Sequence, residues 1–167
     1  MKGMTRRERE ITDRQEIREI LDRSRVAHIA MTDGDEPYVV PMNYGYAMDD
    51  TGTLSLYIHG AMKGRKLDLM RQNPKVFFEM ECDVQPFAGD IACRYGMAYR
   101  SVMGRGRAVF LEYPEEKDAA LALLMKTQTG KEFHFDEKTL QVVTVIRIDV
   151  QEYTAKRRPL PPGVELY

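Results

Sequence analysis

The sequence predicts a mainly β fold, an antiparallel barrel that is closed or nearly closed and carries two or three helices on its outside. Two observations predict it. About six segments have strand composition, and most of them are joined by turns of hairpin length, which argues against a doubly wound sheet. With 167 residues, 43% of them hydrophobic, the chain has the size of a single domain, 1–167, and enough apolar material for its core.

The first half of the chain predicts a helix followed by an antiparallel meander. An amphipathic helix is expected over about residues 12–25, capped by Thr12 or Asp13. Strands are expected at 26–31, 37–46 and 54–59, because turn-forming sequences separate them and the third alternates apolar with polar residues.

After His59 the hydrophobic period changes to that of a short helix, which ends at Asn73-Pro74. The remaining expected elements are strands at 75–81 and 99–111, a helix from Pro114 to near Gly130 and a last strand at 142–153. No helix or strand is predicted for the 82–98 connection, which holds both cysteines. The Pro-rich, basic residues 156–167 predict an extended arm that is available to a partner subunit.

Composition excludes several classes of function. The formal net charge of -1 removes the global electrostatic argument for a nucleic-acid partner. The chain has no apolar run of membrane-spanning length and begins with charged residues, so we expect a cytoplasmic protein without a membrane partner. Cys82 and Cys93 are expected to be reduced thiols. With the three histidines they lack the spacing of zinc ligands, so no metal site is predicted.

Positive charge gathers between Lys63 and Lys75, where five basic residues accompany only Asp68. The sequence Gly-Ala-Met-Lys-Gly-Arg-Lys at 60–66 is typical of a glycine-containing turn from a strand into a helix. Free backbone N–H groups and the positive end of the helix dipole at such a turn favour a phosphate. The alternative is a solvated basic helix face that binds nothing.

The order of these elements resembles a known family. Residues 60–74, G-A-M-K-G-R-K-L-D-L-M-R-Q-N-P, resemble the phosphate-binding loop and helix of the pyridoxamine 5'-phosphate oxidase-like flavin proteins. Residues 38–44, Y-V-V-P-M-N-Y, look like the strand that carries the flavin ring in that family. The sequences Y-I-H-G-A at 57–61 and Y-R-S-V at 99–102 are similar to the branch of 5-nitroimidazole-resistance reductases. The resemblance covers roughly residues 5–158.

This resemblance implies an FMN-binding split β-barrel with Greek-key-like topology, which works as a homodimer with each FMN in a groove between the subunits. It implies that Arg65 and Lys66 hold the phosphate, assisted by Lys63, and that Arg100 and Ser101 lie near the flavin or the partner subunit. The residues expected to bind the cofactor are Pro41, Met42, Asn43, Tyr44, His59, Gly60, Ala61, Lys63, Gly64, Arg65, Lys66, Arg100 and Ser101.

His59 is the candidate catalytic residue, because it ends a strand immediately before the phosphate loop. An imidazole beside the flavin ring can donate a proton or orient a substrate carboxylate or nitro group. The alternative is a structural histidine bonded to a neighbouring strand. His28 is interpreted as structural and His134 as exposed.

The function implied is an FMN-dependent oxidoreductase that reduces a small electrophile, such as a nitroaromatic of the 5-nitroimidazole kind, with electrons from a reduced nicotinamide or another donor. A first alternative is a non-catalytic flavin- or haem-binding protein, with His59 or His28 as the axial ligand. A second is a true pyridoxamine 5'-phosphate oxidase. This alternative is weaker, because such oxidases end in a tryptophan-containing substrate segment and this chain has no tryptophan.

Overall fold

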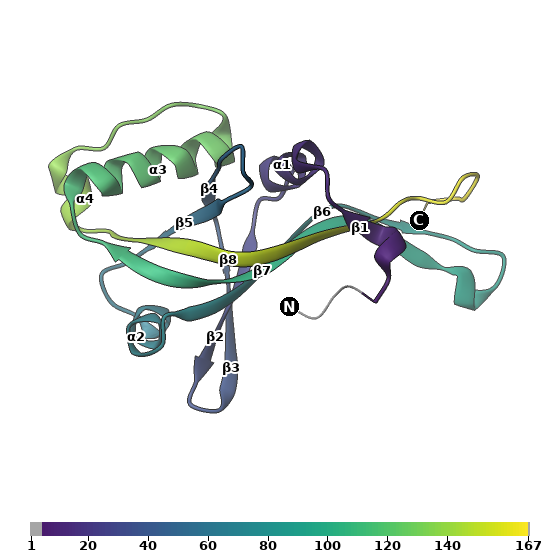
Figure 1. The fold of residues 1–167 in the computed structure, drawn as a ribbon, viewed down its shortest axis with the longest axis horizontal. Coiled ribbons are helices and arrows are strands. Elements are labelled where there is room, and N and C mark those ends of the chain that lie inside the picture. The colour runs from purple at the N-terminus through teal and green to yellow at the C-terminus, as the bar shows by residue number, and fades with distance from the viewer. Residues whose placement is uncertain (1–4, 167) are drawn as a thin grey trace.

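An eight-stranded antiparallel sheet organises the computed structural model, which describes residues 5–166 (Figure 1). The first four residues and Tyr167, which belong to the predicted domain and arm, lie outside the described residues. The strands are β1 (Glu10–Ile11), β2 (Ala27–Asp33), β3 (Glu36–Met42), β4 (Gly45–Met48), β5 (Leu54–Gly60), β6 (Lys75–Phe87), β7 (Gly96–Leu111) and β8 (Thr144–Arg158). The helices are α1 (Arg14–Arg23), α2 (Arg65–Gln72), α3 (Pro114–Thr129) and α4 (Glu137–Gln141), with short 3-10 turns at Arg7–Arg9 and Ala92–Arg94.

The sheet forms a barrel that is not closed by hydrogen bonds between its two edge strands. Its strand order is β3-β2-β6-β7-β8-β5-β4, and β1 pairs with β8. The edge strands β3 and β4 follow each other in the chain, so residues 43 and 44 carry the backbone from one edge of the sheet to the other. Within the described residues no ladder joins these two edges. The predicted antiparallel barrel with peripheral helices is therefore confirmed in its split form.

The prediction of one strand over residues 37–46 was wrong in one respect. The segment forms two strands, β3 and β4, which are separated by Asn43 and Tyr44. The Asn43 side-chain amide donates to the carbonyl of Arg25 at 3.1 Å. The fully buried Tyr44 side chain donates its hydroxyl to the carbonyl of Leu21 at 2.7 Å. These two bonds tie the crossing point to the end of α1 and to the loop after it, which no local sequence pattern predicts.

The 82–98 connection continues the two central strands. β6 extends to Phe87 and β7 begins at Gly96, after a register shift between Cys82 and Gln85 where Asp83 has a φ of 54°. This irregularity interrupts the period-two pattern and conceals the strand in the sequence. The hairpin projects from the body of the sheet (Figure 1).

The C-terminal arm begins later than predicted, because β8 continues to Arg158. Beyond it, the amide of Ala88 donates to the carbonyl of Glu165 at 2.8 Å, and Leu166 bridges to Phe87. In this chain the arm therefore packs on the projecting hairpin of its own subunit. The 3-10 turn at Arg7–Arg9, β1 and the short helix α4 were not predicted.

Apolar side chains form two clusters. The larger lies between the sheet and α1 and includes Ile20, Leu21, Ile29 and Phe78, all fully buried. A smaller cluster, Leu111, Ala120, Leu121, Leu140 and Val145, joins α3 and α4 to the sheet. None of the helices in the described part of the chain has the length and hydrophobicity needed to cross a membrane.

Gly45 permits a close approach between α3 and β4. A Cβ atom at this position would lie 2.4 Å from the backbone of Leu124, so a larger residue would push the helix off the strand. The helix thereby covers the start of β4, directly after the crossing point.

Candidate functional site

The turn from β5 into α2, residues 60–66, carries the predicted phosphate loop. Gly64 caps the helix with a φ of 150° and a ψ of 155°, a conformation open essentially to glycine alone. Its carbonyl accepts from the amides of Leu67 and Asp68, at 2.9 and 3.2 Å. The amides of Arg65 and Lys66 have no acceptor within the helix, as at every helix start. The turn therefore offers N–H donors at the positive end of α2.

Arg65 reaches back to the β2–β3 hairpin. Its Nε donates to Oδ2 of Asp33 at 2.7 Å, and a second guanidinium nitrogen contacts the same oxygen. The guanidinium also lies 4.9 Å from the ring centre of Tyr38. Arg65 is thus held beside the turn, and an anion there would compete with Asp33 for it.

Lys66 points to the other side of the turn. Its Nζ lies 3.4 Å from Sδ of Met42, the last residue of β3, and its stem packs where a side chain on Gly60 would sit. Among residues 5–166, no carboxylate lies within ion-pairing distance of Lys66 or Lys63. The fold therefore brings Met42, Gly60 and Lys66 together around a cation that has no acidic partner.

His59 is the last residue but one of β5 and pairs with Val145 of β8. Partial burial lowers the pKa of its imidazole below the usual 6.5, and the charge of Lys66 lowers this pKa further. His59 is therefore neutral at pH 7 and has one N–H to donate and one nitrogen to accept with.

Several predicted site residues take other positions. The side chain of Tyr44 faces the core and the whole residue is buried, and its carbonyl accepts from Gln128 Nε2 at 2.8 Å, so within this subunit Tyr44 presents no exposed surface to a flavin ring. Pro41 is exposed opposite His28, and Asn43 is exposed beside Met42. Ala61, Lys63 and Gly64 are exposed within the turn.

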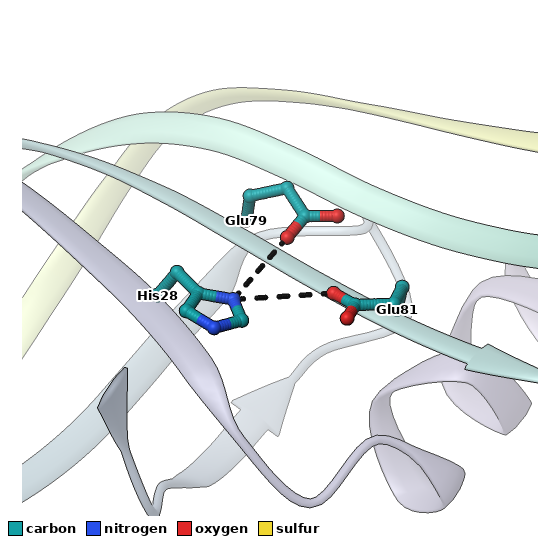
Figure 2. A group of neighbouring side chains, drawn as sticks. All are labelled: His28, Glu79 and Glu81. Carbon is teal, nitrogen blue, oxygen red and sulfur yellow. Dashed lines mark ion pairs between the residues drawn. The ribbon is translucent and has the colours of Figure 1, made fainter. Parts of the chain in front are cut away.

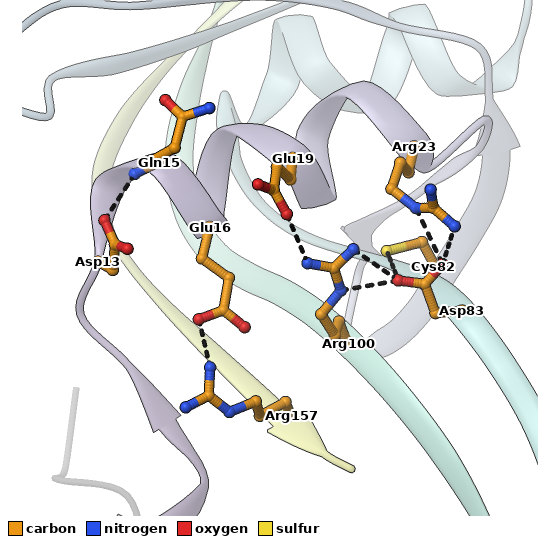
Figure 3. A network of polar contacts seen from close by, with 9 residues as sticks. All are labelled: Asp13, Gln15, Glu16, Glu19, Arg23, Cys82, Asp83, Arg100 and Arg157. Carbon is orange, nitrogen blue, oxygen red and sulfur yellow. Dashed lines mark hydrogen bonds and ion pairs between the residues drawn. The ribbon is translucent and has the colours of Figure 1, made fainter. Parts of the chain in front are cut away.

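Arg100 and Ser101 are not brought to the turn within one subunit. Arg100 donates through Nε to Asp83 at 2.7 Å and through a terminal nitrogen to Glu19 at 3.0 Å (Figure 3). Arg23 binds the same Asp83 from α1 at 2.9 Å. Although partial burial acts in the opposite direction, the two guanidinium groups lower the pKa of Asp83. The network fastens α1 to β6 and β7, while Ser101 is 3% exposed between Glu81 and Lys156.

A cluster on the outer face of β2 and β6 was not predicted from the sequence. Nδ1 of His28 lies 3.5 Å from a carboxylate oxygen of Glu79 and 3.9 Å from one of Glu81 (Figure 2). Burial and the neighbouring Glu81 together raise the pKa of Glu79 to about 7. The Glu-x-Glu spacing on a strand was the available signal, but the partner histidine comes from a distant segment.

Comparisons with known proteins agree with this architecture. The family model described as pyridoxamine 5'-phosphate oxidase matches residues 13–157. A proposed 5-nitroimidazole antibiotic resistance protein from Bacteroides thetaiotaomicron VPI-5482 is 31% identical, with a TM-score of 0.75 over 89% of this chain and 86% of that one. No match was found among curated proteins.

Two more distant structures share the fold. One is a flavocytochrome from Azotobacter vinelandii, 19% identical, with a TM-score of 0.76 over 96% of this chain and 74% of that one. The other is an FAD and haem binding protein from Mycobacterium smegmatis, 17% identical, with a TM-score of 0.78 over 93% and 76%. The family model and the 31% identical structure each extend over most of the chain, and so this protein belongs to the pyridoxamine 5'-phosphate oxidase family of split barrels.

Proposed function

We propose that this protein binds FMN at the β5–α2 turn and acts as an FMN-dependent oxidoreductase on a small electrophile such as a nitroaromatic. The observation that carries the proposal is Lys66, a cation without an acidic partner in the described chain, placed beside His59 and Met42 at the start of α2. The family supports a flavin, and the 31% identical relative named for 5-nitroimidazole resistance supports the substrate class.

The residues at the turn fit a flavin phosphate. Lys63 and Lys66 supply charge, the first amides of α2 supply donors, and Gly64 leaves open space at the helix start. Arg65 would join them by exchanging Asp33 for the phosphate. Met42 and Pro41 offer apolar atoms for a ring, and exposed Asn43 offers a polar edge.

A bound flavin supplies electron transfer from a reduced nicotinamide or another donor to the substrate. The chain's own part is to bind the phosphate, to orient the ring along β3 and to place His59 beside it. As a neutral imidazole, His59 donates a hydrogen bond to a nitro or carboxylate oxygen through one ring nitrogen and can accept one through the other.

The active form in this proposal is a homodimer in the cytoplasm. Val39 and Phe77 are 53% and 38% exposed, and both stand beside Ala30 on the outer face of the sheet. An apolar strip of this kind suits a second copy of the chain. The turn lies on an open surface, so a second subunit would close the site. Cys82 and Cys93 are free thiols in this structure.

Haem is the second candidate ligand, because two proteins with this fold are named as a flavocytochrome and as an FAD and haem binding protein. His59 is the better axial candidate, since Nδ1 of His28 is engaged by two carboxylates. A Soret band in the purified protein would move haem to first place.

The test is an absorbance spectrum after incubation with excess FMN, or separately FAD, and gel filtration. We expect FMN to elute with a dimer. Arg65→Ala with Lys66→Ala should abolish retention, while Arg71→Ala with Lys75→Ala removes the same charge from the last turn of α2 and the start of β6 and should retain it. Equal retention by both double variants would contradict the phosphate assignment.

A further inference from the structure

The pairing of β2 with β6 assembles three metal-ligating side chains on the outer face of the sheet. His28 stands directly opposite Glu79, and Glu81 follows two residues later on the same face of β6. Directly opposed residues have Cβ atoms about 5 Å apart, which is the separation at which two side chains can share an ion. The His28 ring faces both carboxylates (Figure 2).

The distances between the ligand atoms suit a small ion. One nitrogen and two oxygens lie within 4.8 Å of one another, and the two contacts from His28 Nδ1 are 3.5 and 3.9 Å. Metal–ligand bonds of about 2.0–2.2 Å place neighbouring ligand atoms roughly 3–3.5 Å apart. Side-chain rotations alone close the remaining gap, because all three side chains are part-exposed, at 44%, 32% and 41%.

We propose that His28, Glu79 and Glu81 form a binding site for a divalent transition-metal ion, for which Zn²⁺ is the probe. An imidazole with two carboxylates suits zinc, manganese or iron, whereas magnesium and calcium prefer oxygen ligands alone. Two carboxylates also balance the charge of a divalent ion. The site is separate from the β5–α2 turn and uses none of the residues proposed to bind there, and it shares the outer face of β2 and β6 with Ala30 and Phe77.

Three protein ligands leave at least one coordination position open. Glu79 and Glu81 line a cavity of about 250 Å³ whose wall also includes Ser101 and Met103, so water has room beside the ion. The nearby cation Lys156 also lines this cavity, and its ammonium lies 5.5 Å from the ring centre of Tyr99. The positive charge of Lys156 disfavours a bound cation, but the two carboxylates, Glu79 and Glu81, carry more negative charge than it offsets.

An ion here would fasten the sheet where its pairing is short. The β2–β6 ladder has three residue pairs, whereas β7 and β8 share thirteen. His28 lies on one side of this short ladder and both glutamates on the other, so the bound ion bridges the two strands. Because an ion that binds only the folded chain stabilises it, Zn²⁺ should raise the melting temperature.

The experiment titrates chelator-treated full-length protein with Zn²⁺ by calorimetry and with Co²⁺ by visible absorption, in a Cys93→Ser background that removes the exposed thiol. We expect one Zn²⁺ per chain and Co²⁺ bands without thiolate character. His28→Gln and Glu81→Gln should each weaken Zn²⁺ binding at least about tenfold and abolish the Co²⁺ bands. Zn²⁺ should raise the melting temperature of the parent by roughly 5 °C and leave His28→Gln unchanged.

His134→Gln is the matched control, because this exposed histidine faces Asp118 at 3.3 Å and belongs to no three-ligand group in residues 5–166. It should bind Zn²⁺ as the parent does. Absence of stoichiometric binding to the parent overturns the proposal, and so does parental affinity in His28→Gln and Glu81→Gln. Glu81→Gln replaces an exposed side chain and conserves its shape, so it keeps the comparison valid if His28→Gln fails to fold.

Discussion

Arg65 at the start of α2 donates to Asp33 at the end of β2, with 2.7 Å between Nε and Oδ2. The contact holds a residue proposed to bind phosphate against the neighbouring hairpin. Asp33 thus keeps the guanidinium of Arg65 at the turn, and at the same time it competes with the proposed phosphate for that guanidinium.

Asp33→Asn should tighten FMN binding a few-fold, because it frees Arg65 and removes a negative charge near the proposed phosphate position. Stability should fall by less than about 1 kcal/mol, since the Arg65 side chain is 64% exposed. Fluorescence titration of FMN measures the affinity. Asp35→Asn removes the same charge from the adjacent turn and controls for net charge; weaker binding in Asp33→Asn alone would show that Arg65 needs Asp33 to be positioned.

His59→Gln should retain FMN and lower turnover of a nitroaromatic by about 10²-fold, the usual effect of losing a positioned acid or hydrogen-bond donor. Steady-state kinetics with reduced nicotinamide or dithionite as donor measures it. His134→Gln should leave turnover unchanged. If His59→Gln turns over normally and melts at a lower temperature, His59 is structural.

Glu79→Gln should gain stability over the parent as pH rises. The pKa of Glu79 is about 7 in the folded state, raised by burial and by Glu81 from an ordinary 4.5. A raised pKa means that the folded chain holds this proton more tightly, so the contribution is complete below pH 4.5 and is lost as pH rises through about 7.

Glutamine has the shape of a protonated glutamic acid and does not ionise, so the Glu79→Gln variant does not lose this stability as pH rises. Between pH 5 and pH 8 in the presence of a chelator, we expect the stability of Glu79→Gln to rise relative to the parent by about 1 kcal/mol, after allowance for screening of a part-exposed group. Urea unfolding at several pH values checks this, with Glu36→Gln as the charge control. A difference that is flat with pH would contradict the raised pKa.

Tyr44→Phe should lower the free energy of unfolding by about 1 kcal/mol, because it deletes the buried bond to the Leu21 carbonyl and leaves that acceptor unpaired. A drop in melting temperature of roughly 2–4 °C follows for a chain of this size. Tyr46→Phe deletes a bond to the exposed Asp22 and should cost less. Equal losses would indicate that burial does not decide the strength of these bonds.

Local chemistry explains what the sequence predicted well. Period-two alternation placed β5, turn residues separated β2 from β3, and Asn73-Pro74 ended α2, because each depends on neighbouring residues. The glycine-rich basic turn was recognisable for the same reason. Where a bulge at Asp83 interrupted the alternation, the ends of β6 and β7 stayed hidden.

The sequence by itself determined most of the strands, the short turns between them and the basic loop, since backbone preferences and hydrophobic period act over a few residues. Only the tertiary structure decided that Tyr44 faces the core, that Arg100 fastens α1, that Arg65 meets Asp33 and that His28 meets Glu79 and Glu81. Each of these contacts joins distant segments through strand register or helix packing, and a shift of one residue in the register would turn every strand side chain to the opposite face.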